Sequence, residues 1–286
     1  MHKVLVLDFD GTMTDAEKEG GPYRRGYLED LSTLSGLSLD EVLTLATQFD
    51  TEVAKNPHEY GWQFNGQIVA PAVVDPYLRM MPVARKIFDY SQTFLNTNDR
   101  TRILDGILYK YNYPKTLNCF REGAGAVLES LERSATYVVT NSHTEPVRNK
   151  LKSLGRSDAQ NCSLEWLLER VHGSAKKYVI DNAFTEVPER MELKGLPRPI
   201  LLRRAKYYQV LAQILANEKA RFEDLVVVGD IFELDLSLPF ALGARVGLLA
   251  NDFTPEYEKS FLDSHPRGAV LGCVQEIPAF AFGDAR

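Results

Sequence analysis

The chain has 286 residues, of which 44% are hydrophobic, and its formal net charge at pH 7 is -6. A chain of this length can build one large α/β core and a smaller second domain. Acidic and basic residues are spread along the sequence without a long run of lysine and arginine, which argues against a groove for nucleic acid. We therefore expect no nucleic-acid partner.

The cysteines and the beginning of the chain bear on the cellular compartment. Cys119, Cys162 and Cys273 are far apart and form no CxxC pair, which favours reduced thiols over a disulfide framework or a zinc site. The first apolar segment follows Met1-His2-Lys3 directly, so we expect no signal peptide, and no apolar run is long enough to span a membrane. The sequence predicts a soluble, cytoplasmic protein without a membrane partner.

The first apolar segment, Val4 to Leu7, is typical of a strand buried on both faces of a parallel sheet, because its apolar residues do not alternate with polar ones. Asp8 and Asp10 follow it. Side chains two residues apart in an extended chain point to the same side, so these two carboxylates share one pocket. A hard cation such as Mg2+ suits them, since it is commonly held by one or two carboxylates together with water and substrate phosphate.

The run Asp8-Phe9-Asp10-Gly11-Thr12-Met13-Thr14-Asp15 resembles the DxDGTxxD motif of the haloacid dehalogenase-like (HAD) hydrolases. Several segments between residues 16 and 119, such as Tyr27 to Leu37 and Met81 to Leu95, have apolar residues at helical spacing. An insertion at this point is called a C1 cap in that family, a lid that excludes water and selects the substrate. The resemblance implies a doubly wound, Rossmann-like parallel-sheet core over residues 1–15 and 120–286, with a mainly helical cap over residues 16–119.

A second polar group follows the apolar segment Tyr137 to Val139, which ends in Thr140-Asn141-Ser142. A hydroxyl and an amide at the end of a strand, beside free backbone N–H groups, can cradle a phosphate. Taken alone, such residues are ordinary helix caps. Their position after the insertion resembles the second HAD motif, which favours phosphate binding by Thr140 and Asn141.

A third polar group follows the apolar segment Leu225 to Val228. Asp230, Glu233 and Asp235 stand close together in Gly229-Asp230-Ile231-Phe232-Glu233-Leu234-Asp235. Acids at the carboxyl end of a buried strand repeat the pattern of the first strand. This run resembles the GDxxxxD form of the fourth HAD motif.

The resemblance implies a role for each of these residues. Asp8 would attack phosphorus and form an aspartyl-phosphate, and Asp10 would act as general acid and then as general base. Mg2+ would be bound by the side chains of Asp8 and Asp230 and by the backbone carbonyl of Asp10. Asp235, with Glu233 as a second candidate, would orient its waters.

The resemblance also implies a phosphate-stabilising lysine between the second and fourth motifs, but the usual lysine-proline context is missing. Lys177 and Lys206 are equal candidates. Lys177 follows a possible core strand at residues 171–173, and Lys206 begins a helix ahead of the Leu225 strand. Arg203 and Arg204 could instead bind a substrate phosphate or carboxylate, or belong to the solvated surface, where basic residues mostly lie.

The region from residue 158 to residue 199 gives a weaker pattern. Lys177 to Ile180 is strand-like, and a polar stretch separates it from Pro199. This pattern predicts a β-hairpin inserted into the core.

Asp10 and Phe9 distinguish between the reactions of the HAD family. The dehalogenases of the family attack carbon and generally lack an acid at the position of Asp10, so Asp10 favours phosphoryl transfer. The P-type ATPase variant has a lysine at the position of Phe9, so Phe9 excludes that variant. The predicted enzyme is a Mg2+-dependent hydrolase acting on a small phosphorylated metabolite. The alternatives are a phosphomutase, a non-catalytic binding protein of the same fold, or a phosphonate hydrolase with one cap lysine in its site, for which the candidates are Lys18, Lys55, Lys86 and Lys110.

Overall fold

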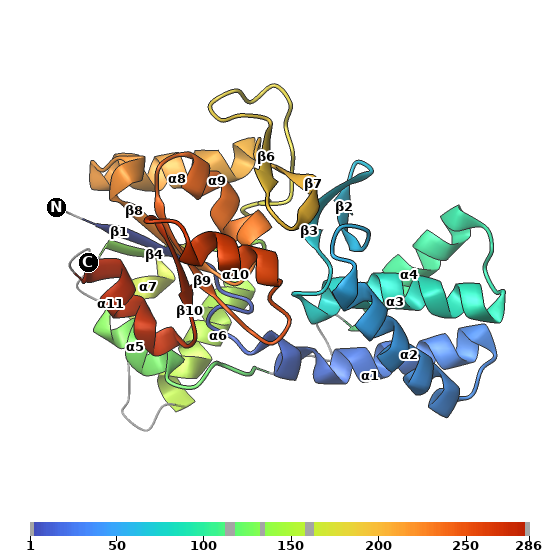
Figure 1. Cartoon of the computed structure of the whole chain (residues 1–286). Coiled ribbons are helices and arrows are strands. Elements are labelled where there is room, and N and C mark those ends of the chain that lie inside the picture. The colour runs from blue at the N-terminus through green and yellow to red at the C-terminus, as the bar shows by residue number, and fades with distance from the viewer. Residues whose placement is uncertain (1–2, 112–117, 132–134, 158–162, 284–286) are drawn as a thin grey trace. The chain divides into compact units, whose positions relative to one another are not determined.

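The computed structural model describes residues 3–111, 118–131, 135–157 and 163–283 (Figure 1). The chain divides into two compact units. Unit 1 comprises Met1–Asp15, Phe64–Ala70 and Phe120–Arg286, and unit 2 comprises Ala16–Gln63 and Pro71–Cys119. Unit 1 therefore includes one short segment, residues 64–70, from within the long insertion.

Unit 1 is built on a six-stranded parallel sheet with the strand order β10-β9-β8-β1-β4-β5. The strands are β1 (Val4–Leu7), β4 (Ala135–Val139), β5 (Val171–His172), β8 (Leu225–Gly229), β9 (Arg245–Leu249) and β10 (Gly268–Leu271). β1 lies inside the sheet, between β4 and β8. This is the doubly wound parallel sheet that the sequence predicted.

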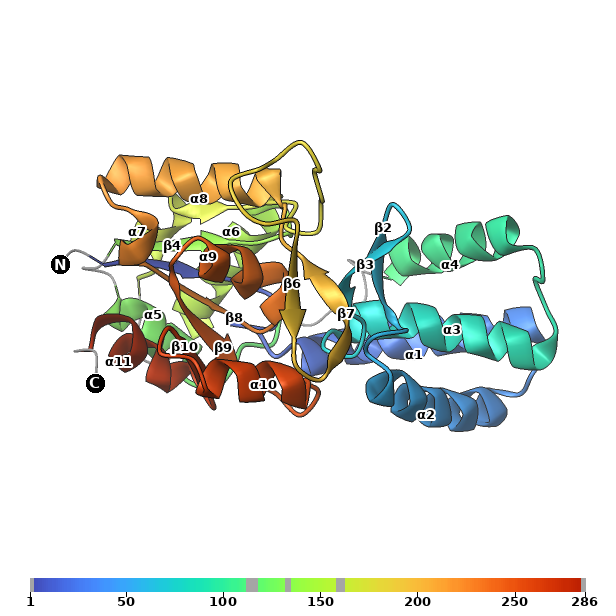
Figure 2. The ribbon, with the colours of Figure 1, turned by 45° about the horizontal axis from the view of Figure 1, so that its top comes forward.

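Both faces of this sheet are covered by helices, which explains why β1 carries no polar residue. Val4 and Val6 belong to one hydrophobic cluster, and Leu5 and Leu7 to another. The first cluster includes residues of α8 (Ala205–Glu218), α9 (Ser237–Ala241) and α10 (Glu256–Asp263). The second includes residues of α5 (Ala124–Ser130), α6 (Thr144–Ser157), α7 (Glu165–Leu168) and α11 (Ile277–Phe282). Figures 1 and 2 show α8 on one side of the sheet, with α5 and α11 on the other.

An antiparallel hairpin of β6 (Arg190–Leu193) and β7 (Leu196–Leu201) is inserted between β5 and α8. A hairpin is therefore present, as predicted, but it lies at the end of the region and extends to Leu201. The strand-like interpretation of Lys177 to Ile180 is wrong, because these residues form a loop. The Val179 amide donates to the Lys176 carbonyl at 3.0 Å and closes a turn there, which an extended strand cannot contain.

Unit 2 is mainly helical, as predicted. Its helices are α1 (Ala16–Ser35), α2 (Leu39–Lys55), α3 (Pro76–Ser91) and α4 (Thr97–Tyr111). α3 packs against both α1 and α2, and apolar side chains of all four helices form a hydrophobic cluster of their own. β2 (Gly61–Phe64) and β3 (Gln67–Pro71) form a two-stranded sheet, in which residues 64–70 are counted with unit 1.

Cys119 and Cys273 carry free thiols, and Cys162 lies outside the described residues. Within the described ranges, none of the helices combines the length and the apolar character that crossing a membrane requires.

Candidate active site

The polar groups singled out in the sequence follow three neighbouring strands. Leu7 of β1 is in register with Val138 of β4 and with Val228 of β8. The residues that follow these strands therefore lie at one edge of the sheet. In open α/β sheets ligands bind outside this carboxyl edge.

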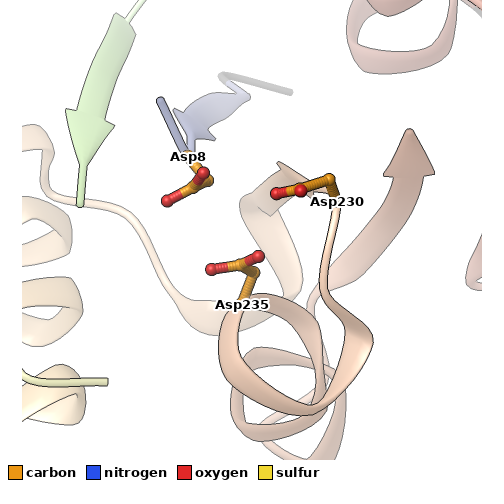
Figure 3. A group of neighbouring side chains, drawn as sticks. All are labelled: Asp8, Asp230 and Asp235. Atoms are coloured by element: carbon orange, nitrogen blue, oxygen red, sulfur yellow. The ribbon is translucent and has the colours of Figure 1, made fainter. Parts of the chain in front are cut away.

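Three carboxylates meet at this edge. Asp8, Asp230 and Asp235 are buried, and each offers an oxygen within 4.8 Å of the others; Figure 3 shows the three side chains converging. Asp235 belongs to a single π-helical turn that follows β8, and its Oδ2 accepts a hydrogen bond from the Ile231 amide at 3.0 Å. Such turns often occur at functional sites.

The turn after β1 closes tightly around these carboxylates. The Thr12 hydroxyl lies 3.1 Å from Asp8 Oδ2 and 3.2 Å from Asp230 Oδ1, so it can donate to either. Gly11 has a left-handed φ of 85°, and a Cβ at this position would lie 2.1 Å from Asp230 Oδ2. Arg121 donates from Nε and Nη2 to the Gly11 carbonyl at 2.9 and 2.8 Å. The sequence did not indicate this role for Arg121, which lies more than a hundred residues away along the chain.

Lys177 joins two of the carboxylates. Its Nζ lies 2.7 Å from Asp8 Oδ1 and 2.8 Å from Asp235 Oδ1, and its side chain is 1% exposed. Lys206, the other candidate, is exposed in the first turn of α8. The structure thus brings Lys177, and not Lys206, to the carboxylates.

The loop that carries Lys177 is fixed to the end of β4. The Ala175 amide donates to the Thr140 carbonyl at 2.9 Å, and the Lys177 amide donates to Asn141 Oδ1 at 2.8 Å. Gly173 makes this close approach possible, because a Cβ there would lie 2.3 Å from the backbone nitrogen of Thr144, at the start of α6. The Asn141 side chain therefore holds the lysine loop.

The structure does not support the interpretation of Arg204 as a phosphate ligand. It is fully buried, and its three nitrogens donate to the backbone carbonyls of Leu201, Lys177 and Val69. Burial lowers the pKa of Arg204 to about 10, against the opposing effect of nearby acids. We do not retain Arg204 as a phosphate ligand, because its guanidinium fixes three segments of backbone.

Asp10 is half-buried and faces a different set of partners from Asp8. Its Oδ2 accepts from Thr140 Oγ1 at 3.3 Å, and its Oδ1 accepts from Lys150 Nζ at 3.1 Å. Lys150 comes from α6 and was not singled out in the sequence, because a lysine on an amphipathic helix is typical of solvated surface.

Burial and charge determine the electrostatics of the site. Burial raises the pKa of Asp8 to about 7, with Lys177 opposing the shift and Asp235 adding to it. Burial acts to lower the pKa of Lys177, but Asp235 and Asp8 outweigh it and raise that pKa above its ordinary value. Lys177 offsets part of the negative charge of Asp8 and Asp235. The three buried carboxylates offer oxygen donors close enough together to fit one divalent cation such as Mg2+.

Glu233, the second candidate for orienting metal-bound water, faces the hairpin. Its carboxylate is fully buried and accepts two hydrogen bonds from Arg198 of β7, at 2.6 and 2.8 Å. Glu258 of α10 is also fully buried, and burial, together with the charge of Glu233, raises the pKa of Glu258 well above its ordinary value.

Comparison with known proteins finds similar structures but no similar sequences among families or curated proteins. No family model matches the sequence, and no curated protein matches it. A HAD hydrolase of Bacillus subtilis, bound to magnesium, is similar with a TM-score of 0.56 and 13% identity, over 98% of this chain and 99% of that chain. A predicted phosphoglycolate phosphatase of Haemophilus somnus is similar with a TM-score of 0.54 and 13% identity, over 97% of this chain and 96% of that chain.

A haloacid dehalogenase-like protein of Agrobacterium tumefaciens gives a TM-score of 0.51 and 14% identity, over 98% of this chain and 97% of that chain. Identities this low show the fold and not the substrate. The sheet order, the acids that follow β1 and β8, and these similarities agree. The chain has the fold of the HAD-superfamily hydrolases, as the motif at Asp8 predicted.

Proposed function

We propose that this protein is a Mg2+-dependent phosphatase that hydrolyses a small phosphomonoester through an aspartyl-phosphate on Asp8. One observation carries the proposal: the buried Lys177 ammonium group contacts both Asp8 and Asp235, beside Asp230. Phosphoryl transfer depends on a positioned nucleophile and on positive charge beside the equatorial oxygens. The site offers both features.

The donor set supports the metal assignment. Asp8 and Asp230 would hold Mg2+ together with the backbone carbonyl of Asp10, and Asp235 would orient its waters. When bound, the ion would neutralise charge on the phosphoryl oxygens and favour the ionised form of Asp8.

The side chains account for both halves of the reaction. Asp8 attacks phosphorus, the ester P–O bond breaks, and Asp10 gives a proton to the leaving oxygen. Asp10 then takes a proton from water, which attacks the aspartyl-phosphate and releases inorganic phosphate and free Asp8. Thr140 and Lys177 donate hydrogen bonds to the phosphoryl oxygens. Each atom and proton is accounted for without another reactant.

Unit 2 is proposed to act as the cap that selects the substrate. It interrupts unit 1 in the sequence, between Asp15 and Phe64 and again between Ala70 and Phe120. Because one similar structure is described as a predicted phosphoglycolate phosphatase, 2-phosphoglycolate is the first natural ester to include in a substrate panel.

The test is phosphate release from p-nitrophenyl phosphate and from a panel of phosphomonoesters, with Mg2+ and with EDTA. We expect Mg2+-dependent turnover, and a loss of about 1,000-fold or more in Asp8→Asn. Asp263→Asn, an exposed position on α10, is the matched control and should behave as wild type.

Two outcomes would contradict the proposal. Absence of turnover by the wild-type protein on every ester would favour a non-catalytic binding protein. Transfer of the phosphoryl group to a second substrate hydroxyl, without release of phosphate, would favour a phosphomutase.

A further inference from the structure

The Asp10 carboxylate is held at both of its oxygens by one stretch of chain, the end of β4 and the helix α6 that follows it. Thr140 Oγ1 lies 3.3 Å from Asp10 Oδ2, and Lys150 Nζ lies 3.1 Å from Asp10 Oδ1. The Lys150 side chain is 20% exposed and that of Asp10 is 34% exposed. The contact therefore lies partly out of water, where a charged hydrogen bond has more influence on orientation than on an open surface.

The position of Lys150 on α6 explains how it reaches Asp10. Val147 and Leu151 are buried in the hydrophobic cluster that also contains Phe9. Lys150 lies three residues after Val147 and directly before Leu151, so it borders the buried face of the helix. Its Nζ is 5.8 Å from the centroid of the Phe9 ring. Lysines in such positions extend their methylene groups over apolar surface and place the ammonium group at the polar edge.

We propose that Lys150 is a positioning residue that holds the Asp10 carboxyl in place for proton transfer. This inference rests on the proposed function, in which Asp10 is the general acid and base. The Thr140 hydroxyl has one proton, and during turnover that proton is donated to the phosphoryl group. Lys150 then becomes the contact that maintains the orientation of Asp10. The two lysines thus have separate tasks, because Lys177 contacts Asp8 and Asp235.

The leaving group distinguishes this role from a general effect on the fold. p-Nitrophenolate leaves readily without a proton, whereas phenolate depends more on the general acid. In Lys150→Met we expect kcat/KM, which reports the transfer of the phosphoryl group to Asp8 and not the later hydrolysis, to fall by about 30-fold for phenyl phosphate, against less than about 3-fold for p-nitrophenyl phosphate. Across a series of substituted phenyl phosphates, the rate should depend more steeply on the acidity of the leaving phenol.

Two variants serve as controls. Lys150→Arg keeps a charged donor and should recover most of the rate with phenyl phosphate. Lys152→Met changes an exposed lysine on the same helix and should match wild type on both esters. Wild type and Asp8→Asn are assayed alongside them.

The possible outcomes separate the inference from the proposed function. If Asp8→Asn is as active as wild type, or if wild type turns over no ester, the proposed function fails and the inference fails with it. If Asp8→Asn is inactive but Lys150→Met lowers kcat/KM equally for all esters, without changing its dependence on the acidity of the leaving phenol, the positioning role alone is overturned. A selective loss on phenyl phosphate that Lys150→Arg restores supports it.

Discussion

The Lys177 ammonium group lies 2.7 Å from Asp8 Oδ1, and the side chains of both residues are at least nine-tenths buried. Solvent screens such a pair much less than it screens a pair on the surface. The pair also joins β1 to the loop after β5, which are separated by 169 positions in the chain. The geometry of Asp8 therefore depends on a loop that is distant in the sequence.

We expect Lys177→Met to lower kcat by about 100- to 1,000-fold, because positive charge beside the phosphoryl group is lost. Lys206→Met should leave kcat unchanged, since Lys206 is exposed on α8. Steady-state kinetics with p-nitrophenyl phosphate at saturating Mg2+ measures both variants, and circular dichroism checks that each is folded. A loss confined to Lys206→Met would contradict the assignment.

Mg2+ should stabilise the folded protein, because the buried carboxylates of Asp8, Asp230 and Asp235 lie close together and repel one another until a cation binds between them. A ligand at 100 times its dissociation constant stabilises by about 2.7 kcal/mol, which corresponds to a rise in Tm of about 5 °C. Thermal unfolding with Mg2+ and with Na+ at equal ionic strength measures the effect. Asp230→Asn should abolish most of the rise, while Asp263→Asn should keep it; an undiminished rise in Asp230→Asn would exclude this site.

Arg204→Met should destabilise the protein by about 3 kcal/mol, since three backbone carbonyls lose a charged donor in a fully buried place. Its neighbour Arg203 is half-buried and donates from Nη1 to the Asn182 carbonyl at 3.0 Å, so Arg203→Met should cost about 1 kcal/mol or less. Urea unfolding gives both values. An equal loss in the free energy of unfolding for the two variants would show that the buried contacts of Arg204 contribute little to stability.

The buried carboxyl group of Glu258 should make the free energy of unfolding depend on pH. Burial and Glu233 raise its pKa in the folded state above the ordinary value of 4.5, so the folded protein binds this proton more tightly than the unfolded chain does. The stabilisation is complete below about pH 4.5 and is lost as the pH rises towards the folded pKa. Glu258→Gln should therefore raise Tm relative to wild type more at pH 8 than at pH 5.

Glu256→Gln is the control for this experiment. Glu256 lies on the same helix, is exposed, and has its pKa lowered by a hydrogen bond from Lys259. The Tm difference between Glu256→Gln and wild type should be small, and its change with pH should have the opposite sign to that of Glu258→Gln. A Tm difference between Glu258→Gln and wild type that does not change with pH would contradict the prediction.

The sheet and its acidic edge could be predicted from the sequence for a physical reason. A strand buried on both faces reads as an unbroken apolar run, and the residue types change abruptly where the run ends. Parallel strands end at one edge, so Asp8, Thr140 and Asp230 lie together although they are far apart in the chain. The fold prediction is confirmed on this basis.

The contacts made by long side chains could not be predicted in this way. Lys177 is delivered by a loop in which Ser174 and Lys176 adopt left-handed φ values of 53° and 50°, and neither residue is a glycine that would signal such a turn. Lys150 has the sequence context of a surface lysine. Arg204 finds one of its acceptors, the Val69 carbonyl, 135 positions away.

The short segment Phe64–Ala70 makes the chain pass between the two units after Asp15, Gln63, Ala70 and Cys119. Replacing residues 16–119 with a linker would therefore remove Val69 together with the helices, and the Arg204 guanidinium would lose a carbonyl that it needs. Unit 1 therefore cannot be separated from residues 16–119 without losing one of its own buried contacts. A graft that exchanges the helices for those of another protein has to retain residues 64–70 or supply an equivalent acceptor.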